Sequence, residues 1–184
     1  MRRTSEPPDE RQYTSRSSEE VRGTLLRLTC DFVLAARRLP GVARIAVMGS
    51  LVTDKARPHD ADVLVTITDD IEFDRLAALG RRLKGMAQGI NSGADVFLAN
   101  ASGTYIGRVC HYRECHPRVL CQARHCGHRQ HLNDDLDVLT LTQASIAAPP
   151  LIVHPTIALV VPVPPDVESL LLSAIRAAPV SPRN

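Results

Sequence analysis

Apolar residues recur every three or four positions near the start of the chain, in the segment SSEEVRGTLLRLTCDFVLAARRLPG. This spacing predicts an amphipathic helix with one buried face. Ser17 or Ser18 can cap its N-terminus, where Glu19 and Glu20 also suit the positive end of the helix dipole. The pair Pro40–Gly41 ends the pattern.

The next apolar runs are short and predict four strands: VARIAVM (42–48), DVLVTI (62–67), ADVFLA (94–99) and TYIGRV (104–109). Helical spacing returns between the second and third runs and predicts a helix over about 71–87, with Asp69 or Asp70 as its cap.

The C-terminal part mixes short elements. NDDLDVLTLTQASI predicts a short helix or strand, and the proline-punctuated APPLIVHPTIALVVPVPP predicts an extended or edge segment. DVESLLLSAIRAA predicts a last helix that Asp166 can cap. We therefore divide the chain into a disordered tail (1–17), a core (18–109), a Cys/His-rich segment (110–131) and a C-terminal part that packs on the core (132–184).

Composition narrows the class of protein. The chain has 184 residues, is 44% hydrophobic and fits one domain. Its formal net charge of +2 does not indicate a nucleic-acid binder. No apolar run reaches the roughly 18 residues that span a bilayer, and the N-terminus lacks the apolar core of a signal peptide, so we expect a cytoplasmic protein. The preference for arginine over lysine suggests a bacterial source.

Two aspartates open the second predicted strand. Side chains alternate along a strand, so Asp60 and Asp62 project from the same face, about 6 to 7 Å apart. Two like charges on one face repel unless a cation lies between them, and hard oxygen ligands suit Mg²⁺. Asp95, at the start of a later strand, can supply a third carboxylate if the two strands pair. Gly49 and Ser50 form a turn that can hold a phosphate.

This segment, GS followed by ARPHDADVLV, resembles the DNA-polymerase-beta-like nucleotidyltransferase superfamily, in particular its minimal bacterial members. The resemblance covers about residues 42–100. It implies an α/β (α+β) fold with a mixed sheet flanked by helices. It also implies that Gly49 and Ser50 contact nucleotide phosphates and that Asp60 and Asp62 bind the metals, two Mg²⁺ ions. By the same analogy, Asp95 binds metal and helps to deprotonate the acceptor hydroxyl.

A simpler interpretation of the same residues stays open. An acidic pair near a strand is short and common, so Asp60 could cap a turn after Pro58 and Asp62 could be a solvated strand end. Asp95 could likewise be a turn residue after NSGA.

Four cysteines form two C-x4-C pairs within the Cys/His-rich segment: Cys110, Cys115, Cys121 and Cys126. Paired thiolates at short spacing are typical of a tetrahedral structural Zn²⁺ site. Three cysteines with His128 or His131 would be an alternative ligand set, and plain thiols or a redox pair are the competing interpretations. Cys30 lies on the apolar side of the first helix and is expected in the core.

The sequence thus favours an enzyme that transfers a nucleoside monophosphate from an NTP to a hydroxyl acceptor, with Mg²⁺. The acceptor could be a small molecule, a partner protein or an RNA. The alternative is a non-catalytic regulatory module on the same fold, which would bind nucleic acid or a partner through the zinc cluster.

Overall fold

The computed structural model describes residues 17–114, 123–125 and 129–178. Its first helix, α1 (Ser18–Ala36), begins with a capping box in which Ser17 accepts from the Glu20 amide and Glu20 accepts from the Ser17 amide. The expected cap at Ser17 is therefore confirmed. Cys30, on the apolar side of α1, is buried in the core, as its apolar neighbours predicted.

The described strands form one mixed sheet in the order β5-β4-β3-β2-β1-β6-β7. Their bounds are β1 (Val42–Met48), β2 (Asp60–Ile67), β3 (Gly93–Asn100), β4 (Tyr105–Val109), β5 (Leu132–Asn133), β6 (Leu151–His154) and β7 (Ala158–Leu159). β2 and β3 are parallel, whereas the other neighbouring strands are antiparallel. The four strands predicted in the first half are confirmed. The segment APPLIVHPTIALVVPVPP was expected to be extended or to form an edge, and it does both: β6 pairs with β1, and β7 is the last strand of the sheet.

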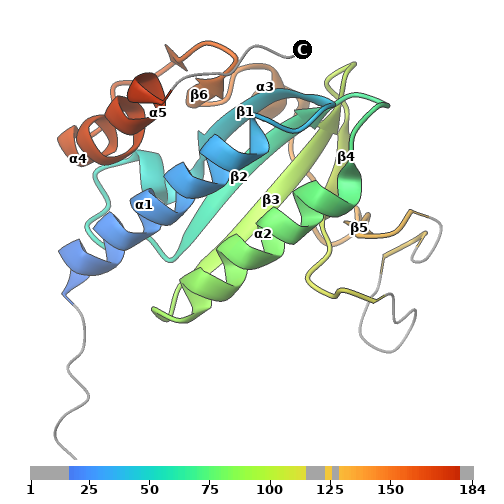
Figure 1. Ribbon diagram of the computed structural model, residues 1–184, viewed down its shortest axis with the longest axis horizontal. Helices are drawn as coiled ribbons and strands as arrows, with labels where there is room; N and C mark the ends of the chain where they lie inside the picture. Colours follow the sequence, from blue (N-terminus) through green and yellow to red (C-terminus); the bar gives the residue numbers. More distant parts are fainter. Residues whose placement is uncertain (1–16, 115–122, 126–128, 179–184) are drawn as a thin grey trace, which may run out of the picture.

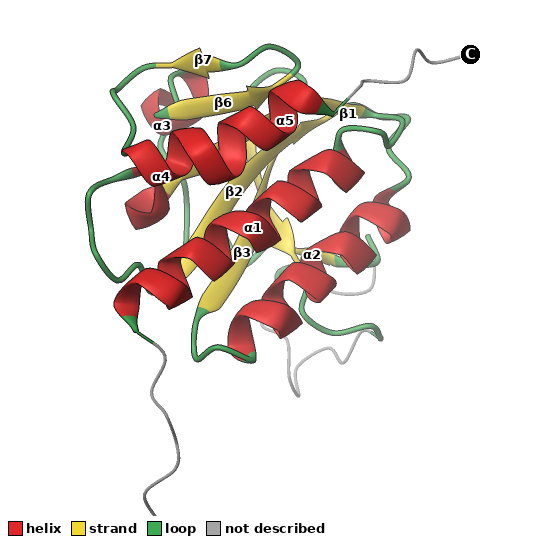
Figure 2. Cartoon of the chain, turned by 60° about the vertical axis from the view of Figure 1, so that its left-hand side comes forward, coloured by secondary structure: helices red, strands yellow, loops and turns green. Residues whose placement is uncertain are grey.

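Helices flank the sheet, and most of them cover one face (Figure 1). α1 and α2 (Phe73–Gln88) lie over β1, β2 and β3 on this face. A C-terminal helical segment packs beside α1 and consists of α4 (Pro165–Val167), the π-helical η2 (Glu168–Leu172) and α5 (Ser173–Ala177) (Figure 2). The mixed α/β architecture expected from the sequence is confirmed.

The other face of the sheet carries a smaller apolar cluster. Its members include Met48, Leu64 and Phe97, and Ile146 of α3 (Gln143–Ala147) packs onto it. Arg44 fixes α3 by donating to the Ile146 carbonyl. NDDLDVLTLTQASI thus contributes a short helix, one of the two options the sequence left open.

Two expected helix caps are wrong. The residue before α2 is Glu72, which makes no side-chain cap bond, and Asp70 instead accepts from the Thr68 hydroxyl. The residue before α4 is Pro164, and Asp166 lies inside the first turn. Both acids lie where a helix starts, but Asp70 is bound by the nearby Thr68, whereas Asp166 is bound by the distant Arg22 of α1.

No helix in the described ranges is both long enough and apolar enough to cross a membrane.

Candidate functional site

The three predicted aspartates lie on one face of two neighbouring strands. β2 and β3 run parallel with Asp62 directly opposite Asp95 and Asp60 opposite Gly93. Ala61, Val63 and Val65 face the helices, so the alternating Asp60 and Asp62 face the other way. The same alternation in β3 turns Asp95 to this face. The pairing of strands that the sequence required for Asp95 to join the site is confirmed.

The Gly-Ser turn lies directly against one of these carboxylates. β1 pairs with β2 so that Met48 is opposite Asp62, and the chain then enters the 3-10 turn η1 (Gly49–Val52). Gly49 has φ +68°, and a Cβ built on it would lie 2.2 Å from Asp62 Oδ2. Only glycine fits this backbone conformation and this contact without strain. The turn and the acidic pair thus belong to one site.

The surroundings of Asp62 disfavour the ionised form of its carboxyl. Its carboxyl is partly buried, and its pKa is raised from 3.8 to about 6, with burial as the largest cause. The charges of Asp60 and then Asp95 act in the same direction. Asp62 therefore loses its proton close to neutral pH, and a cation at this face would favour its ionised form.

Asp95 has a different environment because basic groups surround it. Lys84 Nζ, Arg108 Nη1 and His111 Nε2 each lie 3.5 Å from Asp95 Oδ1. That oxygen is buried and accepts no hydrogen bond from the described residues. Lys84 also lies 2.7 Å from His111 Nε2. Burial lowers the pKa of His111, and the neighbouring Lys84 lowers it further, so the ring is neutral near pH 7 and can accept from Lys84.

The acids do not form a ready-made metal site. Within the described ranges, no three His, Cys, Asp or Glu side chains come close enough together to hold a metal ion. The carboxylates also repel one another, since the charges of Asp60 and Asp95 add to the effect of burial on the pKa of Asp62. The donor chemistry nevertheless suits Mg²⁺: the donors are carboxylate oxygens, and Asp95 Oδ1 is a buried acceptor to which no described residue donates a hydrogen bond.

Most of the expected zinc ligands lie outside the described residues: Cys115, Cys121, Cys126 and His128. Cys110 and His131 are described. Cys110 is buried, and its amide donates to the His131 carbonyl at 2.7 Å. β4 and β5 continue this pairing, so the two ends of the Cys/His-rich segment meet. The segment therefore leaves and re-enters the sheet at one place, as expected of an inserted unit.

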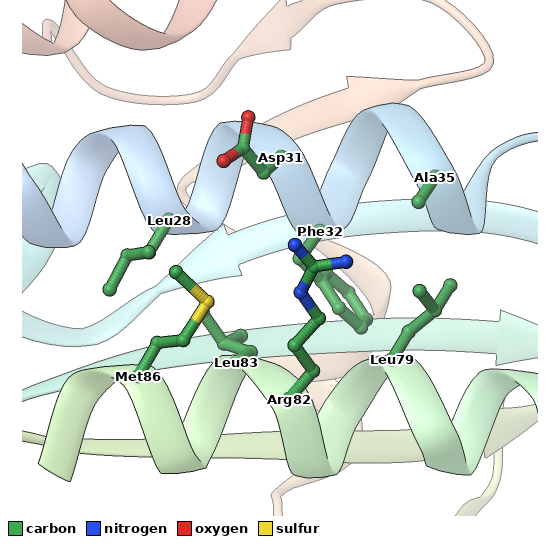
Figure 3. Close-up of a pocket in the computed structure, with 8 residues that line it drawn as sticks. All are labelled: Leu28, Asp31, Phe32, Ala35, Leu79, Arg82, Leu83 and Met86. Carbon is green, nitrogen blue, oxygen red and sulfur yellow. The ribbon is translucent and has the colours of Figure 1, made fainter. Parts of the chain in front are cut away.

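A pocket of about 310 Å³ lies elsewhere, between α1 and α2 (Figure 3). Leu28, Phe32, Leu79 and Leu83 line it, with Asp31 and Arg82 at its rim. It lies on the helical side of the sheet, whereas the aspartates face the opposite side, so it is separate from the acidic site.

The basic neighbours of Asp95 were not predicted as site residues. Lys84 comes from α2, Arg108 from β4 and His111 from the segment that follows it. Their convergence depends on how α2 and β4 pack beside β3, which sequence spacing does not reveal. One feature of the sequence could have drawn attention to Lys84: it is one of only two lysines among the many basic residues.

The fold and the site together define a mixed α/β protein with an acidic cluster beside a Gly-Ser turn. Comparisons with protein-family models, curated proteins and solved structures found no match to this chain.

Proposed function

We propose that this protein is a nucleotidyltransferase similar to the minimal members of the DNA-polymerase-beta-like superfamily. The observation that carries the proposal is the contact of Gly49 with the Asp62 carboxylate, with Asp95 in register on the neighbouring parallel strand. A phosphate-holding turn, an acidic pair and a third acid on the next strand are the parts that nucleotidyl transfer requires. They come from three separate segments of the chain and meet at one face.

The residues have distinct roles in this proposal. Amides of the turn that begins at Gly49 and Ser50 would contact the triphosphate of an NTP. Asp60 and Asp62 would hold Mg²⁺, which supplies charge neutralisation at the phosphates when bound. Asp95 would orient the acceptor hydroxyl and accept its proton. Because Lys84 and Arg108 partly neutralise Asp95, we assign the main metal contacts to the other two acids.

Label transfer from an NTP is the direct test. Each α-labelled NTP is incubated with the protein, Mg²⁺ and a cell extract, beside an Asp60→Ala, Asp62→Ala double variant. We expect transfer to one class of acceptor by the unmodified chain and a loss of roughly 100-fold or more in the variant, because the variant lacks the carboxylates that hold the metal. Chelation of Mg²⁺ should have the same effect.

The alternative is a non-catalytic regulatory or partner-binding module on the same fold. Two observations favour it: Asp95 already lies beside the cations Lys84 and Arg108, and the described aspartates do not form a coordinating cluster. If no NTP labels any acceptor and calorimetry detects no NTP binding in the presence of Mg²⁺, the module is the better description.

We also propose that the Cys/His-rich segment binds a structural Zn²⁺ through four cysteines, Cys110 among them. Metal analysis of protein purified without chelators should give about one zinc per chain. Removal of zinc should destabilise this segment, since metal binding contributes folding free energy there. Because the segment is joined to the sheet at β4 and β5, a Cys110→Ser variant should lower the zinc content but keep the far-UV circular dichroism of the sheet. Zinc-free protein with unchanged thermal stability would rule out the site.

A further inference from the structure

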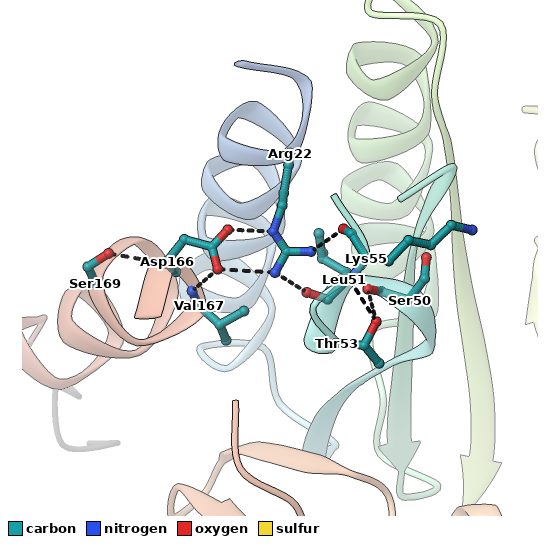
Figure 4. A network of polar contacts seen from close by, with 8 residues as sticks. All are labelled: Arg22, Ser50, Leu51, Thr53, Lys55, Asp166, Val167 and Ser169. Carbon is teal, nitrogen blue, oxygen red and sulfur yellow. Dashed lines mark hydrogen bonds and ion pairs between the residues drawn. The ribbon is translucent and has the colours of Figure 1, made fainter. Parts of the chain in front are cut away.

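A buried arginine joins α1 to the Gly-Ser turn and to the C-terminal helical segment (Figure 4). The side chain of Arg22 is 8% exposed. Its Nη2 donates to the Leu51 carbonyl at 3.2 Å, and its Nη1 donates to the Lys55 carbonyl at 3.0 Å. Its Nε and Nη2 also donate to the two carboxylate oxygens of Asp166. One side chain thus connects three segments that are far apart in the sequence.

The chemistry of this contact requires arginine. A guanidinium presents its N–H groups in a planar fork that binds a carboxylate with two parallel bonds and still leaves donors for carbonyls. A lysine ammonium could reach only part of this set. The hydrogen bond from Arg22 lowers the pKa of Asp166, so the acid is ionised at neutral pH and the pair stays charged.

The two carbonyls that Arg22 binds belong to the segment between the Gly-Ser turn and the acidic pair. Leu51 is fully buried, but the chain is exposed from Thr53 to Arg57. The turn is closed by the amide and hydroxyl of Thr53, which both donate to the Ser50 carbonyl. The bond from Arg22 to Lys55 extends this anchoring into the exposed part. The shape of the turn beside Asp62 therefore depends on a residue of α1.

We propose that Arg22 and Asp166 form a clamp that holds residues 49–55 in the shape that receives the nucleotide phosphates, which makes Arg22 a positioning residue. The part of this inference that concerns phosphates depends on the proposed nucleotidyltransferase function. The clamp also makes the C-terminal helical segment part of the site, although this segment lies on the helical side of the sheet.

Arg37 supplies a matched control. It also lies at α1, is 4% exposed and donates to two carbonyls of the C-terminal part, those of Ile175 and Ala178. Neither of these hydrogen bonds reaches the turn. Replacing Arg22 or Arg37 with lysine therefore removes a comparable buried contact between α1 and the C-terminal part, but only the change at Arg22 releases residues 49–55.

The experiment compares Arg22→Lys, Arg37→Lys and the unmodified chain. Amide hydrogen exchange is followed at Thr53 and Lys55, and calorimetry measures binding of ATP, GTP, CTP and UTP separately with Mg²⁺. We expect exchange at both amides to become about 10-fold faster in Arg22→Lys and to stay unchanged in Arg37→Lys. NTP binding should weaken by about 10-fold in Arg22→Lys alone. Asp166→Asn keeps the arginine and serves as a second variant if Arg22→Lys does not fold.

Each result has a distinct meaning. Equal exchange in the two lysine variants, or no change in either, overturns the clamp. Faster exchange with unchanged NTP binding overturns the positioning role but leaves the proposed function standing. If exchange becomes faster in Arg22→Lys but the unmodified chain binds no NTP, the structural clamp is supported. The proposed function is then overturned, and the role of the clamp in receiving phosphates is overturned with it.

Discussion

Replacing Asp62 with asparagine is expected to raise the free energy of unfolding at pH 7.5 and to abolish Mg²⁺-dependent NTP binding. The carboxyl has a folded pKa of about 6 against an ordinary value of 3.8, so its ionised form is disfavoured in the folded chain. This difference corresponds to about 3 kcal/mol at 1.36 kcal/mol per pKa unit. Because the carboxylate is only partly buried, we expect Asp62→Asn to raise the free energy of unfolding by only about 1–2 kcal/mol.

The stabilisation by Asp62→Asn should depend on pH in a defined direction. Below about pH 3, under the ordinary pKa of 3.8, the carboxyl is mostly protonated in both the folded and the unfolded chain, and the variant should gain little. As the pH rises from about 4 to above 6, the unfolded chain releases the proton first, so the unmodified protein loses stability that the variant keeps. Urea unfolding at pH 4, 5, 6 and 7.5 measures this difference, and Mg²⁺ should reduce it by stabilising the unmodified chain alone.

Asp31→Asn is the control for this prediction. Asp31 is exposed on α1 at the rim of the pocket on the helical side, away from the acidic face. Its replacement should change stability by less than about 0.5 kcal/mol at each pH and should leave NTP binding intact. If Asp62→Asn is destabilising at pH 7.5, the carboxylate has a favourable partner in the folded protein, and the electrostatic account of this site is wrong.

The positions of the acids could be predicted because they depend on local rules. Strand alternation placed Asp60 and Asp62 on one face, and a hydrophobic run beginning with Ala94 marked the strand that carries Asp95. Gly49 was recognised as a turn residue on sequence grounds, and its positive φ agrees with this. Local rules thus placed Asp60 and Asp62, whereas Asp95 joins them only because β2 and β3 pair in parallel with Asp62 opposite Asp95.

The contacts around these acids could not be predicted because they join distant segments. Arg22 and Asp166 are 144 residues apart, and each looks ordinary in its own helix: one follows the apolar Val21, and the other resembles a cap. Lys84 reaches Asp95 from a helix whose sequence pattern specifies only its apolar face. Such pairs are determined by how the layers pack, and a single sequence carries no information on that packing beyond which faces are apolar.

Replacing Gly49 with alanine is expected to lower the free energy of unfolding by about 2–3 kcal/mol. NTP binding should also weaken, by more than the loss of stability alone explains. About 1–2 kcal/mol comes from the positive φ of +68°, which disfavours a side chain whatever the space. The new methyl group would also lie 2.2 Å from Asp62 Oδ2, so the carboxylate must move, at a cost of about 1 kcal/mol.

Gly85→Ala shows what the same change does without these constraints. Gly85 is an exposed residue in α2, and an added Cβ meets no atom within 4 Å. Alanine is the better helix former, so this variant should be more stable by about 0.5–1 kcal/mol.

A double-mutant cycle separates the two costs at Gly49. In an Asp62→Ala background the carboxylate is absent, so the penalty for alanine should fall to the backbone part, about 1–2 kcal/mol. In an Asp62→Asn background the amide occupies the same space without the charge, and the full penalty should persist. Equal penalties in the alanine and asparagine backgrounds would mean that the turn does not touch Asp62 in solution. The proposal that the turn and the acidic pair form one site would then lose its main support, because that contact is what joins them.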